Sequence, residues 1–219
     1  SPQIGQILIY KWVDGSFDLF WSSDEINGYP YGIEVVDINN DDYNDLLVSC
    51  SGVQLFLNNS GTISFYGEIS STTPDDKFLV ADLNGDNKKD LALGSPYSNS
   101  GYAIKLYEQS TGLNFTYNSE INATNGSNMI KPLNYNNDGL SDILNGELYS
   151  GDVYVFKNNN SFSFDSVFTY KFDTRIFSIE SSDFDNDGYD DFLVAEAWAN
   201  IHFFKNKQDT FEIEYNGSN

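Results

Sequence analysis

The stretch that decides the fold is Asp183-Phe184-Asp185-Asn186-Asp187-Gly188-Tyr189-Asp190-Asp191, which leads directly into the apolar run Phe192-Leu193-Val194-Ala195. Positions 1, 3, 5 and 9 of this stretch carry carboxylates, and position 6 is glycine. Oxygen ligands at alternate positions of a loop can surround one hard divalent cation, and glycine permits the sharp turn that such wrapping needs. The stretch therefore predicts a metal-binding loop that runs into a β-strand.

The same nine-residue pattern occurs three more times along the chain, at residues 37–45, 82–90 and 134–142. The first residues of the four loops, at 37, 82, 134 and 183, lie 45, 52 and 49 positions apart. A regular period of about 20 to 50 residues is typical of solenoids and propellers. The repeat therefore sets the organisation of the whole chain.

Each loop offers the side chains at positions 1, 3, 5 and 9 and the main-chain carbonyl at position 7 as candidate calcium ligands. Position 6 is occupied by residue types that tolerate a left-handed backbone, namely Asp42, Asn87, Gly139 and Gly188. The candidate ligands are Asp37, Asn39, Asp41, Tyr43, Asp45, Asp82, Asn84, Asp86, Lys88, Asp90, Asn134, Asn136, Asp138, Leu140, Asp142, Asp183, Asp185, Asp187, Tyr189 and Asp191.

The four sites are not expected to bind calcium equally. The fourth loop offers four carboxylates and the first two loops offer three each, whereas the third offers only Asp138 and Asp142. Because ligand charge tunes calcium affinity, the third site is predicted to be the weakest of up to four. An EF-hand would need a glutamate at position 12, which is Val48, Leu93, Asn145 or Val194 here, so these are not EF-hands.

Between the loops, β-rich runs recur out of phase with the metal pattern, at residues 7–11, 53–57, 104–108, 153–157 and 201–205. Each is followed, after a short polar or glycine-containing break, by another aromatic-bearing run, at residues 16–23, 63–70, 114–121, 161–168 and 210–216. These pairs are typical of β-hairpins. Short apolar runs also flank every loop, so one unit consists of a strand, a metal loop and three further strands.

The pattern predicts an all-β protein, a β-propeller built from four-stranded antiparallel blades. We expect one propeller-type domain, or a propeller fragment, over residues 1–219, with complete repeats at 32–70, 77–121, 129–168 and 177–216. A half blade at 6–23 lacks its loop-bearing strand pair. Because an open sheet edge promotes aggregation, the missing strands are expected from an upstream segment, a neighbouring subunit or ring closure.

The loops resemble the FG-GAP or VCBS repeats of integrin-α-type β-propellers, in which the pattern Asp-x-Asp/Asn-x-Asp-Gly/Asn-x-x-Asp precedes an apolar strand. The resemblance covers nearly the whole chain. It implies a calcium ion between the first two strands of each blade, usually within a seven-bladed ring. Four repeats and a half blade depart from that blade count.

The charge of the chain excludes several classes of partner. Its 33 acidic and 11 basic residues give a formal net charge of −22, which disfavours nucleic acid and anionic membrane surfaces. No apolar stretch approaches the roughly 20 residues of a membrane span, and no leader pattern is present, so direct membrane insertion is not expected. The crowded carboxylates either point apart into water or share a divalent cation, and their regular spacing favours the cation.

The sequence does not indicate an enzyme. His202 and Cys50 are the only histidine and cysteine, so neither a Ser/His/Asp nor a Cys/His arrangement is convincing, and Cys50 reads as a small buried hydrophobe. Paired carboxylates for glycoside hydrolysis are an alternative, but the best placed are assigned to metal. A sugar-stacking role is a hypothesis for the tryptophans Trp12, Trp21 and Trp198. Packing in the blade cores is the favoured interpretation of these rings.

Two functional hypotheses remain. The preferred one is an extracellular or cell-surface module for adhesion or recognition of a protein or glycan, and the alternative is a structural scaffold within a larger secreted or surface assembly. Calcium is abundant outside cells, which favours secretion. Six Asn-x-Ser/Thr sequons add weak support for a glycoprotein, and they begin at Asn58, Asn114, Asn122, Asn125, Asn159 and Asn216.

Overall fold

The computed structural model describes residues 4–24, 26–28, 30–50, 52–70, 77–94, 102–123, 129–197, 200–208 and 210–217. The chain forms two compact units, Ser1–Asp76 and Lys77–Asn219. Across these described ranges every regular element is a β-strand. No helix there has the length and apolar character required to span a membrane.

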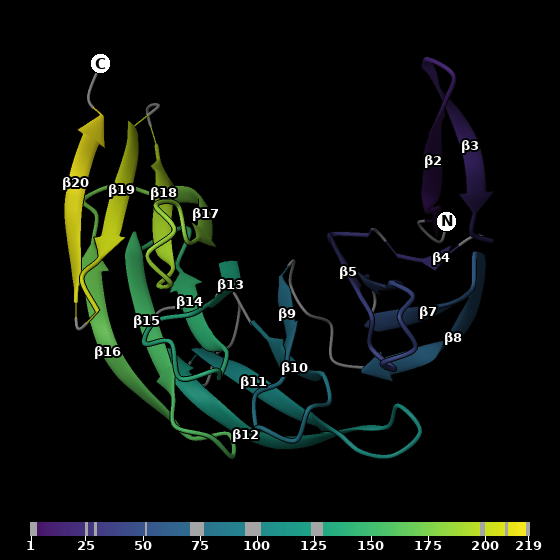
Figure 1. Cartoon of the computed structure of the whole chain (residues 1–219), viewed down its shortest axis with the longest axis horizontal. Coiled ribbons are helices and arrows are strands. Elements are labelled where there is room, and N and C mark those ends of the chain that lie inside the picture. Colours follow the sequence, from purple (N-terminus) through teal and green to yellow (C-terminus); the bar gives the residue numbers. More distant parts are fainter. Residues whose placement is uncertain are drawn as a thin grey trace. The chain divides into compact units, whose positions relative to one another are not determined.

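The second unit contains three four-stranded antiparallel sheets, drawn from teal to yellow in Figure 1. In each sheet the strands are hydrogen-bonded in sequence order, and the first strands of successive sheets are neighbours, β9 beside β13 and β13 beside β17. The strands are β9 (Phe78–Ala81), β10 (Asp90–Leu93), β11 (Tyr102–Gln109), β12 (Phe115–Ala123), β13 (Met129–Leu133), β14 (Asp142–Gly146), β15 (Asp152–Asn158), β16 (Phe164–Lys171), β17 (Ile176–Ser182), β18 (Asp191–Glu196), β19 (Asn200–Asn206) and β20 (Phe211–Gly217).

The first unit contains one four-stranded sheet of the same kind, a hairpin and a short ribbon. The sheet consists of β5 (Gly32–Val36), β6 (Asp45–Ser49), β7 (Val53–Asn59) and β8 (Thr62–Ser70). The hairpin pairs β2 (Leu8–Val13) with β3 (Ser16–Ser22), and the ribbon pairs β1 (Ile4–Gly5) with β4 (Ile26–Asn27). The ribbon was not predicted, because two-residue strands leave no periodic signal in a sequence.

Apolar side chains between successive sheets form the cores. In the second unit one cluster joins the β9–β12 and β13–β16 sheets, and another joins β13–β16 to β17–β20 around the stacked rings of Phe192 and Phe204, whose centroids are 4.5 Å apart. In the first unit Ile7 and Ile26 pack with Leu46 of the sheet. Burying each such side chain away from water stabilises the folded state by about 1.5–3 kcal/mol, and this burial is what holds neighbouring sheets together.

A register shift recurs in the hairpin formed by the last two strands of every sheet. It falls between Leu55 and Phe56, Leu106 and Tyr107, Val155 and Phe156, and Phe203 and Phe204. The β2–β3 hairpin has the same shift, between Ile9 and Tyr10. In this feature the β2–β3 hairpin is like the last two strands of the four-stranded sheets, while the half blade expected at 6–23 stays a prediction.

The predicted all-β class and the four-stranded antiparallel sheets are confirmed, whereas the ring and its blade number stay predictions. One strand start is wrong: the run expected from Ser161 begins only at Phe164. Asn160, Ser161 and Phe162 have positive φ angles of 75°, 53° and 59°, which extend the turn. The expectation that tryptophans pack in cores fails for Trp12, which is 60% exposed, and Trp198 lies outside the described residues.

Candidate metal centre

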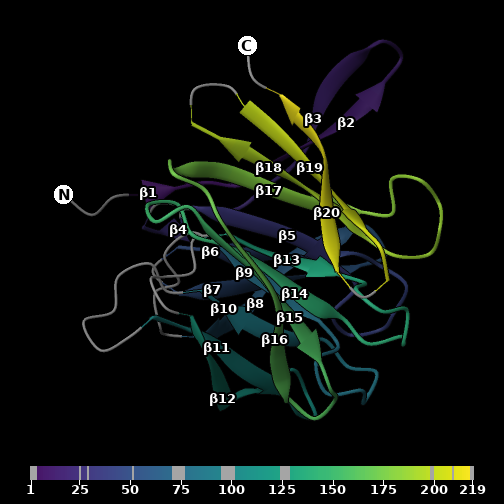
Figure 2. The ribbon, with the colours of Figure 1, turned by 90° about the vertical axis from the view of Figure 1, so that its left-hand side faces the viewer.

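The four acidic loops occupy equivalent places in the four sheets. Each connects the first strand to the second, and the second strand begins at the aspartate in position 9 of the loop. In the second unit the three loops extend from the same side of their sheets (Figure 2). The sequence pattern therefore marks the same structural element four times.

The backbone of every loop turns twice through the left-handed region. Position 6 has a positive φ at Asp42, Asn87, Gly139 and Gly188, as predicted. Position 4 has one too, at Asn40, Gly85, Asn137 and Asn186. Sequence reasoning missed position 4, although its restriction to asparagine and glycine was the available signal.

The position-1 carboxylate organises the loop by accepting main-chain N–H groups. In the fourth loop the Oδ1 and Oδ2 atoms of Asp183 accept from Asp187 (3.0 Å) and Gly188 (2.9 Å). Asp37 accepts equivalent bonds from Asp41 (3.0 Å) and Asp42 (2.8 Å). These bonds curl the backbone around the position where the alternating side chains converge.

The position-9 aspartate fastens each loop to the third strand of its own sheet. Its carboxylate accepts a main-chain N–H from Asn58, Gln109, Asn158 or Asn206 at 2.7–2.9 Å. All four of these aspartates are fully buried, and burial raises the pKa of Asp90 and of Asp142 to about 6. Because each carboxylate oxygen has more than one lone pair, these bonds leave capacity for a metal.

The fourth loop brings three carboxylates together. Single oxygens of Asp183, Asp185 and Asp187 lie within 4.8 Å of one another. Lys205, on β19, forms an ion pair with Asp185, and its Nζ lies 3.6 Å from Asp187 Oδ2. The sequence did not reveal this lysine, which partly neutralises the cluster that a cation would occupy. In the second loop Lys88 pairs with Asp86 in the same way, at 2.6 Å.

The third loop contains a buried oxygen that fits a metal ligand. Asn136 Nδ2 donates to Asp138 Oδ2 (2.7 Å), while Asn136 Oδ1 is buried without a hydrogen-bond partner among the described residues. Leaving such a group unpaired costs about 1–3 kcal/mol. A hard cation at the centre of the loop would offset that cost, because amide oxygens are among the ligands that calcium prefers.

Position 1 of the third loop is asparagine for a structural reason. Asn134 Nδ2 donates to the Gly188 carbonyl (3.1 Å) of the next loop, which an aspartate could not do. The Asn134 main-chain N–H also donates to Asp190 Oδ2 (2.7 Å). Contact with its neighbour therefore accounts for the lower carboxylate count of this loop.

The residues at position 7 of each loop directly follow the second left-handed turn. Main-chain N–H groups of the position-7 residues Tyr43, Lys88, Leu140 and Tyr189 donate to the position-5 carboxylates at 2.9–3.1 Å. Which of these oxygens bind a metal stays a prediction.

The two residues considered for catalysis lie apart from the loops. His202 is buried on β19, and its Nε2 lies 2.8 Å from Glu196 Oε2, a partner that the sequence did not reveal. Glu196 Oε1 also accepts a bond from the Thr174 hydroxyl (2.6 Å). Cys50 is buried just after β6, as expected of a small apolar side chain.

Comparisons with known proteins identify the repeat. The FG-GAP-like repeat profile matches residues 37–93 and 134–194, more than half of the chain. A comparison with curated proteins finds no match. Among solved structures, a rhamnogalacturonan lyase PL11 of Bacillus licheniformis is similar, with a TM-score of 0.49 and 12% identity, over 91% of this chain and 54% of that one. The chain thus spans about half the length of that lyase.

Proposed function

The chain belongs to the FG-GAP-like repeat family, and from this membership we propose that it is an extracellular calcium-binding β-propeller module for adhesion or ligand recognition. In this proposal calcium rigidifies the loops between the first two strands of each blade. The observation that carries it is the convergence of Asp183, Asp185 and Asp187 in a loop whose architecture recurs four times. The orphaned Asn136 Oδ1 supports it independently.

Calcium titration of the metal-stripped protein by calorimetry tests the proposal. We expect up to four bound ions and a melting temperature that rises with calcium, because one site filled at 100 times its dissociation constant adds about 2.7 kcal/mol. Asp185→Ala should remove one ion, whereas Asp173→Ala, an exposed aspartate outside the loops, should remove none. A melting curve that is identical in excess chelator and in excess calcium would refute a structural role for the metal.

We propose further that the module binds rather than catalyses, and that it acts outside the cell. The engagement of His202 with Glu196 inside the β17–β20 sheet supports a structural role for the only histidine. FG-GAP repeats are typical of extracellular proteins, where calcium concentrations suit loop sites of modest affinity. A purely structural scaffold within a larger assembly is the second candidate function.

The edge of the β2–β3 hairpin that is unpaired among the described residues supports the proposal that further strands complete its sheet. In the described part of the chain β2 pairs with β3 alone, although the shared register shift makes β2 the equivalent of a third strand. Trp12 and Phe17 on the hairpin are 60% and 67% exposed. We therefore propose that a loop-bearing strand pair from a neighbouring subunit or further chain lies along β2. Protection of the β2 amides from hydrogen exchange would detect it.

A further inference from the structure

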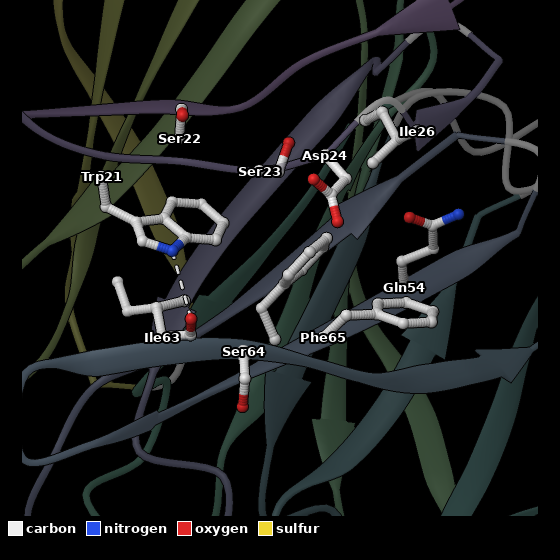
Figure 3. A pocket seen from close by; sticks show the side chains of 10 residues that line it. Trp21, Ser22, Ser23, Asp24, Ile26, Gln54, Ile63, Ser64 and Phe65 are labelled. Atoms are coloured by element: carbon white, nitrogen blue, oxygen red, sulfur yellow. Dashed lines mark hydrogen bonds between the residues drawn. The ribbon is translucent and has the colours of Figure 1, made fainter.

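A cavity of about 440 Å³ in the first unit has the lining of a small-molecule site. Residues 21–24 and Ile26 form one side, and residues of β7 and β8 form the other (Figure 3). Its volume falls within the range of about 300–1,000 Å³ that ligand pockets occupy. None of its lining residues belongs to an acidic loop, so the cavity is separate from the candidate metal centre.

Three aromatic rings, together with Ile26 and Ile63, form the apolar part of the cavity. Trp21 and Phe56 meet edge to face with centroids 5.8 Å apart, and Phe56 lies 5.3 Å from Phe65. Trp21 Nε1 donates to the Ile63 carbonyl (3.1 Å), which fixes the indole against β8. Phe56 is buried, whereas Phe65 is 58% exposed. The aromatic side of the cavity is thus preorganised, and the cavity is accessible from solvent at Phe65.

The polar part of the cavity consists mainly of Asp24 and Gln54. In Figure 3 the Asp24 carboxylate points across the cavity toward the β7–β8 side, and Gln54 lies at the opposite end from Trp21. Ser23 is occupied elsewhere, because its hydroxyl accepts the Ile7 N–H (2.9 Å) and its carbonyl accepts from Gln6 Nε2 (2.8 Å). These bonds hold in place the segment that carries Asp24.

We propose that this cavity binds a neutral saccharide. A pyranose ring has an apolar face that matches the aromatic side of the cavity and hydroxyl groups that both donate and accept hydrogen bonds, as Asp24 and Gln54 together require. Its lining contains a carboxylate but no cationic side chain, which disfavours anionic ligands. A quaternary ammonium ion could contact the rings and Asp24, but it would leave the Gln54 amide without a partner. The inference rests on the proposed role in ligand recognition and not on calcium.

Two exposed lining residues allow the test without disturbing the core. Phe65→Ala and Asp24→Ala are to be compared with Phe177→Ala and Asp173→Ala, which alter an equally exposed phenylalanine and an exposed aspartate of the second unit. Binding is measured on an array of neutral and uronic-acid oligosaccharides, and then by calorimetry with the best neutral hit and with choline. We expect each lining variant to weaken that binding about tenfold, and each control to leave it unchanged.

The outcomes separate this inference from the proposed function. Absence of neutral hits, equal losses in the control variants, or preferential binding of choline or of uronic-acid oligosaccharides would overturn the saccharide assignment. Calcium binding is titrated in the same samples. Intact calcium binding without saccharide binding refutes the cavity alone, and saccharide binding in a chain that takes up no calcium refutes the metal proposal alone.

Discussion

Replacing Lys205 by methionine should strengthen calcium binding at the fourth loop. The lysine ammonium lies 3.6 Å from Asp187 Oδ2 and contacts Asp185, so a calcium ion must displace it to reach both carboxylates. Methionine keeps a long apolar side chain while removing the charge. The substitution therefore tests only the electrostatic competition between the lysine ammonium and calcium for the two carboxylates.

The size of the effect follows from the distance and the exposure of the groups. Two unit charges 3.6 Å apart interact by about 1 kcal/mol in water and about 5 kcal/mol at an effective dielectric of 20. Because the Asp185 and Asp187 side chains are 41% and 36% exposed, the lower end applies to each pair. Without the lysine, calcium no longer has to replace these two ion pairs, which together contribute about 1–2 kcal/mol. The calcium dissociation constant of the fourth loop should therefore be about 5- to 30-fold lower.

Calorimetric titration of the metal-stripped protein measures this change. The affected site is assigned by adding Asp185→Ala to the Lys205→Met variant, which should abolish the gain. Lys171→Met serves as the control, because Lys171 pairs with Asp152 outside the loops (2.8 Å). An unchanged or weaker fourth site in Lys205→Met would show that the lysine does not compete with the metal.

Three further predictions concern stability and site order. After metal removal, melting temperature should fall as pH rises from about 4 toward 7. Burial raises the pKa values of Asp90 and Asp142 to about 6 in the folded protein, so the folded state binds their protons more tightly than the unfolded chain does. The resulting stabilisation is complete below the unfolded pKa of about 3.9 and is lost as pH passes about 6. A rise in melting temperature over that range would contradict the assignment. Asn158→Ala should lower the free energy of unfolding in urea by about 1–3 kcal/mol, because its amide donates to the Leu83 and Ser141 carbonyls, whereas exposed Asn159→Ala should change it little. The third loop should show the highest calcium dissociation constant when variants retaining one loop each are titrated, and the tightest binding there would reverse the ranking.

The sequence predicted the repeated elements because their signals are local. Alternating oxygens, glycine or asparagine at the turns, and short β-rich runs all lie within a few residues of one another, and the loops and hairpins follow from them. The late start of β16 escaped prediction because three successive left-handed residues, one of them Phe162, oppose the ordinary preference of those side chains.

Features that depend on contacts between repeats could not be predicted. Asn158 reaches Leu83, 75 residues earlier in the chain, and Asn206 reaches Tyr135, 71 residues earlier. Lys205 enters a loop formed by another part of its own sheet. Repeat spacing identifies which residues occupy equivalent positions, but the packing of one sheet on the next determines which of them meet.

The bonds between Asn134 and the fourth loop have a consequence for metal uptake. The main-chain N–H of Asn134 is bound to the Asp190 carboxylate and its side-chain amide to the Gly188 carbonyl, so the entry to the third loop is tied to the end of the fourth. An ion that orders the backbone of one loop therefore also restricts the backbone of the other. The two loops should fill cooperatively, and their combined titration should depart from the curve of two independent sites.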